Sequence, residues 1–274
     1  MFNFGLVMEQ INSSNTVIEN DTPVSIIACK DGGTIAYEFI PGNSPGVIFF
    51  PGLHSDMNGA KASAFRSFCK QTKQAFLRFD YRGHGKSSGN FEDFTIGDWV
   101  EDALYVLDNL TFGPQIIIGS SMGGWIMLLA ALKRPERIVS LLGLAPAPDF
   151  TEDLIWSAMN CEQKLEMEKR GYIDLPNCYD EKKPYRITHK LVLEGRKHLL
   201  LGKEIKIDVP VHLIHGLDDQ DVPFETSQRL SEKLSSNCVD VTLVKSGDHR
   251  LSDEVNLRKA EHVLMLFLRL FNTN

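Results

Sequence analysis

Residues 115–124 read Gln-Ile-Ile-Ile-Gly-Ser-Ser-Met-Gly-Gly, an apolar run that ends in a glycine-rich turn. The apolar run is typical of a strand that is covered on both faces. The apolar residues from Trp125 to Lys133 predict a helix, which Arg134-Pro135 then ends. The glycines allow strand and helix to approach closely. The stretch therefore predicts a strand, a sharp turn and a helix, with the hydroxyl of Ser121 exposed at the turn.

The turn matches the pattern G-x-S-x-G, which arises by chance about 0.1 times in a chain with these Gly and Ser contents. A second match, Gly85 to Gly89, lies four residues beyond its strand and is not followed by a helix. We interpret the second match as a loop. Ser121 is the candidate nucleophile, and the alternative is a small residue selected for tight packing at the turn.

The rest of the chain alternates short apolar runs with longer amphipathic segments, which predicts an α/β fold with a mostly parallel sheet flanked by helices. The stretch from Ile96 to Leu110 has the apolar spacing of one helix face. The first two strands are separated only by Asp31-Gly32-Gly33, which indicates an antiparallel hairpin. The expected strands cover residues 24–30, 34–40, 47–50, 75–80, 115–119, 138–145, 211–215 and 239–245.

The alternation of short apolar runs and amphipathic segments is absent between Ala147 and about Ile207. Four prolines, Pro146, Pro148, Pro176 and Pro184, punctuate helical stretches of mixed charge, such as Glu162 to Arg170, and no strand run is evident. About sixty residues exceed an ordinary connection between strands. We therefore expect a helical cap insertion at about 147–207 within a single domain that spans residues 1–274.

Composition excludes several classes of protein. The 274 residues include 29 basic and 36 acidic side chains, a net charge of −7, and no basic stripe, so nucleic acid is not an expected partner. The longest apolar runs fall far short of the roughly 20 residues of a membrane span, so stable membrane insertion is not expected. No complete phosphate-binding or dinucleotide-binding motif is present, because Asp80 stands where a P-loop needs its first glycine.

The cysteines indicate reduced thiols. Five are scattered along the chain without a C-x-x-C pair, which indicates neither a zinc site nor a redox motif, and we expect no metal and no cofactor. Residues 1–29 contain no Lys or Arg, unlike a secretory n-region or an Arg-rich transit peptide. These two features lead us to expect a cytoplasmic protein.

A serine nucleophile needs an imidazole base and a carboxylate that orients the base. In strand-turn-helix enzymes both partners follow the serine in sequence. His249 lies on the loop after the strand 239–245 and is the candidate base, with a surface histidine as the alternative. The loop after the strand 211–215 offers Asp218, Asp219 and Asp221, and spacing alone does not separate these three acids.

Two further histidines accompany the acid loop. His212 and His215 are three residues apart on one expected strand, so they point to opposite faces and do not form a metal pair. A structural role is the simplest interpretation of His215. His54 and His84 lie on loops that border the same expected pocket.

Acyl transfer also needs two N–H donors for the oxyanion. Met122, the residue after the nucleophile, supplies one, and Leu53, on the loop after the strand 47–50, is the candidate for the other. An ordinary turn is the alternative for Leu53. Trp156 and Met159 are candidates for an acyl channel, together with Phe150, Leu154 and Ile155. Their helical spacing is equally typical of a cap helix packed on the body of the protein.

Three motifs resemble those of the α/β-hydrolase superfamily and occur in the same order along the chain: Asp80 to Ser87, Gly119 to Gly124 and His215 to Pro223. The resemblance implies the α/β-hydrolase fold and places the acid on Asp219. Further stretches, Ser44 to Gly52, Met57 to Gly59, Gly113 to Gln115 and Ser246 to Arg250, are similar to the palmitoyl-protein thioesterase and mycophenolic acid acyl-glucuronide esterase type of α/β-hydrolase-domain enzyme. The similarity covers roughly residues 24–270 and is loosest in the insertion. Enzymes of that type are mitochondrial, but the leader composition leads us to expect a different compartment here.

The resemblance and the motifs together imply a serine hydrolase that cleaves acyl esters or thioesters through an acyl-enzyme intermediate. Its expected substrates are an acylated small molecule or an acyl-protein, as in a palmitoyl-protein thioesterase or a carboxylesterase. A peptidase that uses the same triad is one alternative. A non-catalytic binding protein that uses the pocket as a receptor is another, although such a protein needs no complete Ser, His and Asp set.

Overall fold

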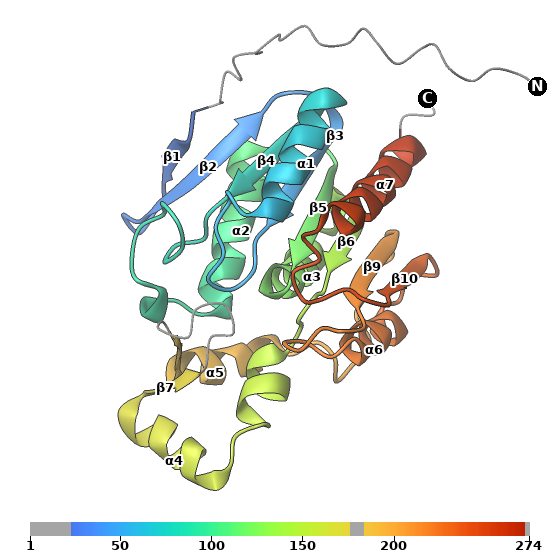
Figure 1. The fold of residues 1–274 in the computed structure, drawn as a ribbon. Coiled ribbons are helices and arrows are strands. Elements are labelled where there is room, and N and C mark those ends of the chain that lie inside the picture. The colour runs from blue at the N-terminus through green and yellow to red at the C-terminus, as the bar shows by residue number, and fades with distance from the viewer. Residues whose placement is uncertain (1–22, 176–183, 272–274) are drawn as a thin grey trace, which may run out of the picture.

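The computed structural model describes residues 23–175 and 184–271 and centres on an eight-stranded sheet (Figure 1). The strand order is β1-β2-β4-β3-β5-β6-β9-β10. The pairs β1-β2 and β2-β4 are antiparallel, and all other pairs in this sheet are parallel. The strands are β1 (Ser25–Ala28), β2 (Thr34–Ile40), β3 (Asn43–Phe50), β4 (Gln74–Phe79), β5 (Gln115–Ser120), β6 (Ile138–Leu144), β9 (Val211–Gly216) and β10 (Val239–Val244). The predicted α/β fold and the opening hairpin are confirmed.

Helices cover both faces of this sheet. Figure 1 shows α1 (Ala60–Gln71) and α7 (Glu254–Phe271) on one face, with α2 (Ile96–Leu110) and α3 (Met122–Lys133) on the other. Along β3, Val47 and Phe49 join the hydrophobic core under α1 and α7, whereas Ile48 and Phe50 join the core under α2 and α3. Because both faces are covered, the central strands carry continuous apolar runs, such as Val47 to Phe50 and Ile116 to Ile118, as the sequence indicated.

The segment between β6 and β9 forms a separate layer of short elements below the sheet in Figure 1. Its elements are η3 (Thr151–Trp156), α4 (Cys161–Arg170), β7 (Tyr172–Leu175), β8 (Tyr185–Thr188), α5 (His189–Gly195) and η4 (Arg196–His198). The expectation that this segment lacks strands is wrong, because β7 and β8 pair antiparallel. Each has only four residues and neither joins the main sheet, so no long apolar run announces them. Pro176 and the other residues from 176 to 183 lie outside the described residues, as do residues 1–22.

This layer packs on the body through the face that carries α3. Phe150 meets the ring of Trp125 edge to face at 5.7 Å between centroids, and the indole N–H of Trp125 donates to the carbonyl of His198 at 3.1 Å. Phe150, Met159 and Leu191 belong to the same hydrophobic cluster as α2 and α3. The layer therefore shares its core with the sheet.

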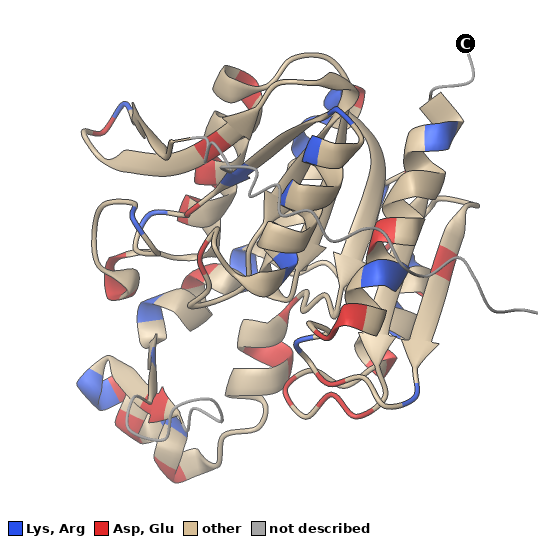
Figure 2. Ribbon diagram, turned by 45° about the horizontal axis from the view of Figure 1, so that its top comes forward, with Lys and Arg blue, Asp and Glu red and all other residues tan. Residues whose placement is uncertain are grey.

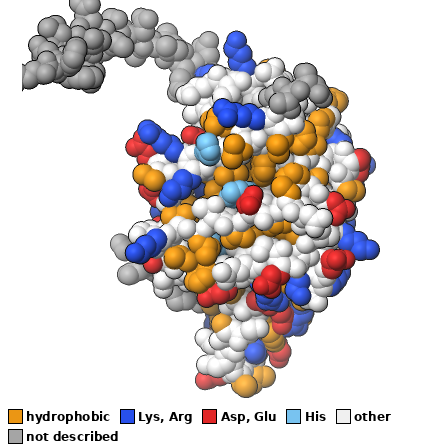
Figure 3. Space-filling model, turned by 90° about the vertical axis from the view of Figure 1, so that its right-hand side faces the viewer, with side chains coloured by type: hydrophobic (Ala, Val, Ile, Leu, Met, Phe, Trp, Pro, Cys, Tyr) orange, Lys and Arg blue, Asp and Glu red, His pale blue; other side chains and the backbone are white. Residues whose placement is uncertain are grey.

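A groove lined by both apolar and polar side chains lies between β9, β10 and α7. In Figure 3 this face of the molecule is rich in hydrophobic side chains. His212 lines this groove. His215 lies on the other face of β9, where its ring contacts the hydroxyl of Ser227 in α6 (Glu225–Lys233). The prediction that these two histidines point to opposite faces is confirmed.

A buried ion cluster holds the antiparallel edge to α1. The carboxylate of Glu38 accepts from the Nε atoms of Arg66 at 2.7 Å and Arg78 at 2.5 Å, and Glu38 is only 1% exposed. Arg78 also donates from Nη1 to the backbone carbonyl of Met57 at 2.7 Å. The cluster thus connects β2, β4 and α1 to the loop that follows β3.

Replacing Glu38 by Gln will destabilise the fold by about 3 to 5 kcal/mol, because two buried guanidinium groups lose the carboxylate that they share. Urea unfolding measures this. Glu254→Gln is the matched control, because Glu254 pairs with Arg258 on the surface of α7, where such a pair contributes about 0.5 kcal/mol or less. Equal effects of the two substitutions would contradict the structural importance of the cluster.

Candidate active site

Ser121 occupies a sharp turn between β5 and α3. Its backbone has φ 54° and ψ −121°, a conformation that a residue with a side chain adopts only when its surroundings impose it. The Ser121 N–H donates to the carbonyl of Leu144 at 3.0 Å, and the Ser121 carbonyl accepts from the N–H of Ala147 at 3.0 Å and of Gly124 at 2.8 Å. These bonds to the end of β6 and to α3 hold the turn in place.

Two glycines make this turn possible. A Cβ at Gly123 would lie 2.1 Å from the carbonyl oxygen of Phe50, and a Cβ at Gly119 would lie 2.6 Å from the carbonyl oxygen of Gly123. Both distances are far below van der Waals contact. The first turn of α3 therefore rests directly on the end of β3. The contact between Gly119 and Gly123 is the close approach of β5 and α3 that the glycine pattern predicted.

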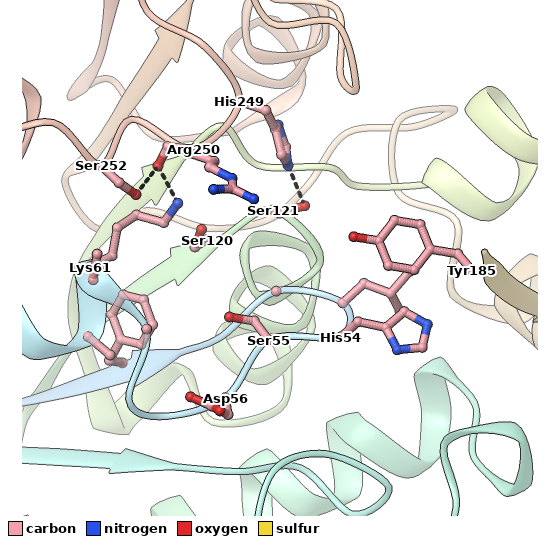
Figure 4. Close-up of a pocket in the computed structure, with 16 residues that line it drawn as sticks. His54, Ser55, Asp56, Lys61, Ser120, Ser121, Tyr185, His249, Arg250 and Ser252 are labelled. Atoms are coloured by element: carbon pink, nitrogen blue, oxygen red, sulfur yellow. Dashed lines mark hydrogen bonds between the residues drawn. The ribbon is translucent and has the colours of Figure 1, made fainter. Parts of the chain in front are cut away.

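The three predicted polar residues come into contact at the carboxyl ends of the strands. The Nε2 atom of His249 lies 3.0 Å from Oγ of Ser121, and its Nδ1 atom lies 2.8 Å from Oδ2 of Asp219 (Figure 4 draws the first bond). Asp219 stands 30 residues before His249 and on a neighbouring loop. Of the three acids that spacing left open, Asp219 is the one that meets the histidine.

The loops that carry Asp219 and His249 are bound to each other through their backbones. The N–H of Asp218 donates to the carbonyl of Gly247 at 3.0 Å. A Cβ at Gly216 would lie 2.0 Å from the same carbonyl oxygen, so only glycine allows the loops to come this close. Lys61, at the start of α1, donates from Nζ to the carbonyl of Arg250 and secures the histidine loop from the other side (Figure 4).

The carboxylate of Asp219 is buried and fully hydrogen-bonded. Its side chain is 0% exposed; Oδ1 accepts from the N–H groups of Asp221 at 2.9 Å and Val222 at 2.8 Å. Oδ2 accepts from His249 and from His215. Burial alone raises the pKa of such a group, but the donors around it outweigh burial and hold the pKa of Asp219 well below its usual range. Asp219 is therefore ionised at neutral pH.

The loop after β3 is held beside Ser121 by Asp80. The Asp80 carboxylate accepts from the N–H of Met57 at 2.7 Å and of Lys86 at 2.8 Å, which ties this loop to the one after β4. Burial raises the pKa of Asp80. A Cβ at Gly85 would lie 2.1 Å from Oδ2 of Asp80, so the motif that begins at Asp80 needs a glycine there.

The two candidate oxyanion donors lie at this junction. Leu53 lines the cavity next to Ser121, and Met122 is the first residue of α3. Within residues 23–175 and 184–271, neither backbone N–H donates to another group of the protein. Gly52 packs against the nucleophile, since a Cβ there would lie 3.2 Å from Cβ of Ser121. The position is suitable for holding the oxygen of a substrate carbonyl.

A cavity of about 440 Å³ opens beside Ser121 and His249 (Figure 4). Sequence reasoning missed three of its lining residues, Lys61, Arg250 and Tyr185. Lys61 lies two residues after the stretch Met57 to Gly59, and Arg250 ends the stretch Ser246 to Arg250, so these two stretches were the available signal. Tyr185 comes from the short strand β8, and no sequence signal indicated it. Burial is the main cause that lowers the pKa of Lys61 to about 8.

An aromatic stack joins the segment between β6 and β9 to the cavity. The ring of His54 stacks on Tyr185 at 4.9 Å between centroids and lies 3.8 Å from the ring of Phe91. His84 continues this cluster next to Phe91 and Trp99 and is 5% exposed. His54 thus borders the cavity as expected, whereas His84 lies in the protein interior.

Trp156 and Met159 do not line this cavity. Trp156 stacks on His189 at 5.9 Å and lies under the guanidinium of Arg196 at 4.8 Å, and Met159 is buried in the core shared with α3. Their helical spacing corresponds here to packing of the segment on the body, the alternative that the sequence left open.

Charges of both signs are distributed over the helices, and acidic residues gather on the loop after β9 (Figure 2). Asp219 and Asp221 of that loop and His249 of the loop after β10 bring potential metal ligands within 4.8 Å of one another. The Asp219 oxygens already accept four hydrogen bonds from the protein. The geometry therefore fits a carboxylate that orients the imidazole of His249 better than it fits a metal centre. All four cysteines in the described residues have free thiols.

The fold and this geometry define an α/β-hydrolase. The family model described as alpha/beta hydrolase fold matches residues 45–161. The mitochondrial palmitoyl-protein thioesterase ABHD10 of Bos taurus is 41% identical over 86% of this chain and 77% of its own length, and the Homo sapiens protein is also 41% identical over the same shares. The solved structure of mouse ABHD10 has a TM-score of 0.86 at 37% identity, covering 91% of this chain and 100% of that chain. The chain belongs to the ABHD10 family of α/β-hydrolases.

These relatives correct the expected compartment. The prediction of a cytoplasmic protein is wrong, because the ABHD10 relatives of this chain are mitochondrial. Reduced thiols argue against the secretory route but do not distinguish among compartments in which thiols stay reduced. Among the described helices, none is both long enough and apolar enough to cross a bilayer.

Gly123→Ala will slow the labelling of Ser121 by a fluorophosphonate probe by about 100-fold, because the added methyl group pushes α3 off the end of β3 and displaces the hydroxyl. Labelling rates on folded protein measure this. Gly202→Ala is the control, since a Cβ there meets nothing within 4 Å. Labelling of both variants at the wild-type rate would contradict the packing argument.

His84 makes folding depend on pH. Burial lowers the pKa of His84 to about 4 from 6.5, so between these values the unfolded chain binds more protons than the folded chain. The His84 contribution to stability is therefore lost as the pH falls through this window. His84→Phe will remove this contribution, and His54 and His212, whose pKa values burial also lowers, contribute in the same direction. Asp102, whose pKa burial raises to about 6, contributes in the opposite direction in both proteins. Urea unfolding between about pH 4.5 and 7.5 measures the slope of stability against pH; an unchanged slope in the variant would refute the assignment to His84.

Proposed function

We propose that this chain is a serine hydrolase that cleaves acyl esters and thioesters, with Ser121 as nucleophile, His249 as general base and Asp219 as the acid that orients His249. The observation that carries the proposal is the continuous set of hydrogen bonds from Ser121 through His249 to the buried, ionised Asp219. Such a set activates a hydroxyl that is otherwise a weak nucleophile at neutral pH.

The reaction follows from these contacts. His249 takes the proton of Ser121 through Nε2 as Oγ attacks the substrate carbonyl, and the backbone N–H groups of Leu53 and Met122 hold the oxygen that becomes negative. His249 then gives the proton to the leaving alcohol or thiol. Water then attacks the acyl-enzyme. His249 takes a proton from this water and returns it to Oγ of Ser121, and the carboxylic acid product is released. Asp219 keeps the Nδ1–H tautomer of His249 throughout.

The proposed substrate class is an acylated protein, with acylated small molecules as the second class. The names of the ABHD10 relatives support the first, because those proteins are palmitoyl-protein thioesterases. The position of the cavity beside Ser121 supports either class. We further propose that residues 147–207 form a cap on a single hydrolase domain, because Tyr185 of this segment borders the cavity.

Ser121→Ala will lower the hydrolysis of acyl thioesters by at least about 10⁴-fold, because the acyl-enzyme cannot form. Hydrolysis of acyl-peptide thioesters and p-nitrophenyl esters, from acetyl to palmitoyl, measures both activity and chain-length preference. A preference for long-chain thioesters supports the depalmitoylase; a short-ester optimum supports a small-molecule esterase. Ser120→Ala is the control, since Ser120 also lines the cavity but the hydrogen bond of His249 Nε2 is with Ser121. Equal inactivity of wild type and variant on every donor would favour a binding protein.

A further inference from the structure

His215 lies at the end of β9 with its imidazole 0% exposed, and the mechanism above does not use it. Its Nε2 atom lies 3.1 Å from Oδ2 of Asp219 and 3.0 Å from the carbonyl oxygen of Val222. Its Nδ1 atom lies 2.7 Å from Oγ of Ser227, which is itself fully buried in α6. All polar atoms of this side chain are therefore engaged.

These partners determine which nitrogen carries the proton. A carbonyl oxygen and an ionised carboxylate can only accept, so Nε2 of His215 must carry a hydrogen. The hydroxyl of Ser227 both donates and accepts, and it donates to Nδ1 when the ring is neutral. Ser227 thereby fixes the tautomer in which His215 donates to Asp219.

One oxygen of the Asp219 carboxylate therefore accepts hydrogen bonds from the N–H groups of two imidazoles. Oδ2 of Asp219 accepts from His249 at 2.8 Å and from His215 at 3.1 Å, while Oδ1 is held by two backbone N–H groups. Removing His215 leaves Oδ1 anchored but leaves Oδ2 with His249 alone. The orientation of the oxygen that faces the base then depends on the base itself.

We propose that His215 is a positioning residue for catalysis, which orients Oδ2 of Asp219 toward His249 and is itself locked in the donating tautomer by Ser227. The proposal rests on the roles proposed above for Ser121, His249 and Asp219. It assigns a function to a histidine for which a structural role is the simplest interpretation of the sequence.

Other charged groups near Asp219 and His249 also influence the pH dependence of the reaction. Asp221 lies within the same 4.8 Å cluster as Asp219 and His249. Lys61 from α1 interacts electrostatically with Asp219, Asp248 and Arg250. The substitutions at His215 leave all of these groups in place, so a change in the profile reports the altered hydrogen bonding of Asp219.

The test compares His215→Leu, which removes the donor, with His215→Gln, whose side-chain amide restores an N–H. The matched control is His212→Leu, three residues earlier on the same strand, where Nε2 bonds only to Oγ1 of Thr242. Two readouts are measured: kcat/KM for a thioester across pH, and the rate of fluorophosphonate labelling of Ser121. The labelling rate needs no knowledge of the natural substrate.

We expect His215→Leu to lower kcat/KM and the labelling rate by about 10- to 100-fold, because the base is no longer held in register. The acidic limb of the pH profile will move up by about half a pH unit, since Asp219 keeps its charge, loses a donor and attracts the proton on His249 more strongly. His215→Gln will restore most of both, and His212→Leu will match wild type. Ser227→Ala will move both readouts in the same direction by a smaller amount.

Three outcomes would overturn the proposal: a wild-type rate and profile in His215→Leu, an equal loss in His212→Leu, or no recovery in His215→Gln. If His215→Leu does not fold, Ser227→Ala decides, and a wild-type rate and profile in that variant counts against the proposal. Failure of the proposed function is distinguishable, because wild-type protein would then not be labelled at Ser121 at all.

Discussion

The contact between the first turn of α3 and the carbonyl oxygen of Phe50 is the constraint on which the site depends. At Gly123 the two backbones are too close for any Cβ, so helix and strand meet without a layer of side chains. This contact forces the chain at Ser121 into a left-handed turn and directs the hydroxyl away from the core. It also sets the start of α3, with Met122, beside the loop after β3, which carries Leu53.

The other components of the site are held near Ser121 by hydrogen bonds between loops. Asp80 joins the loops after β3 and β4, and the bond from Asp218 to Gly247 joins the loops after β9 and β10. Each bond connects loops at the carboxyl ends of parallel strands, where ligands bind in open α/β sheets. The side chains that face the cavity are thus held by a frame that does not depend on substrate.

The sequence predicted this frame better than it predicted the surroundings of the cavity. Continuous apolar runs identify buried strands, and glycines next to Ser121 identify the turn, because both are local consequences of burial and sterics. Asp219 was not separable from Asp218 and Asp221 by spacing, since only the folded loop shows which carboxylate meets His249. Helical periodicity marks Trp156 and Met159 as an apolar face, but it does not distinguish a face that lines a cavity from one that packs on the body. Tyr185 and the strand β8 have too short a local pattern to be seen at all.

The left-handed backbone at Ser121 also bears on how such chains change over generations. Glycine adopts φ 54° at far lower cost than any residue with a side chain, so replacing Ser121 by glycine relieves strain while it removes the hydroxyl. Selection on folding alone would accept that replacement, and only selection on the chemistry opposes it. A serine retained in this turn is therefore evidence of sustained demand for its hydroxyl.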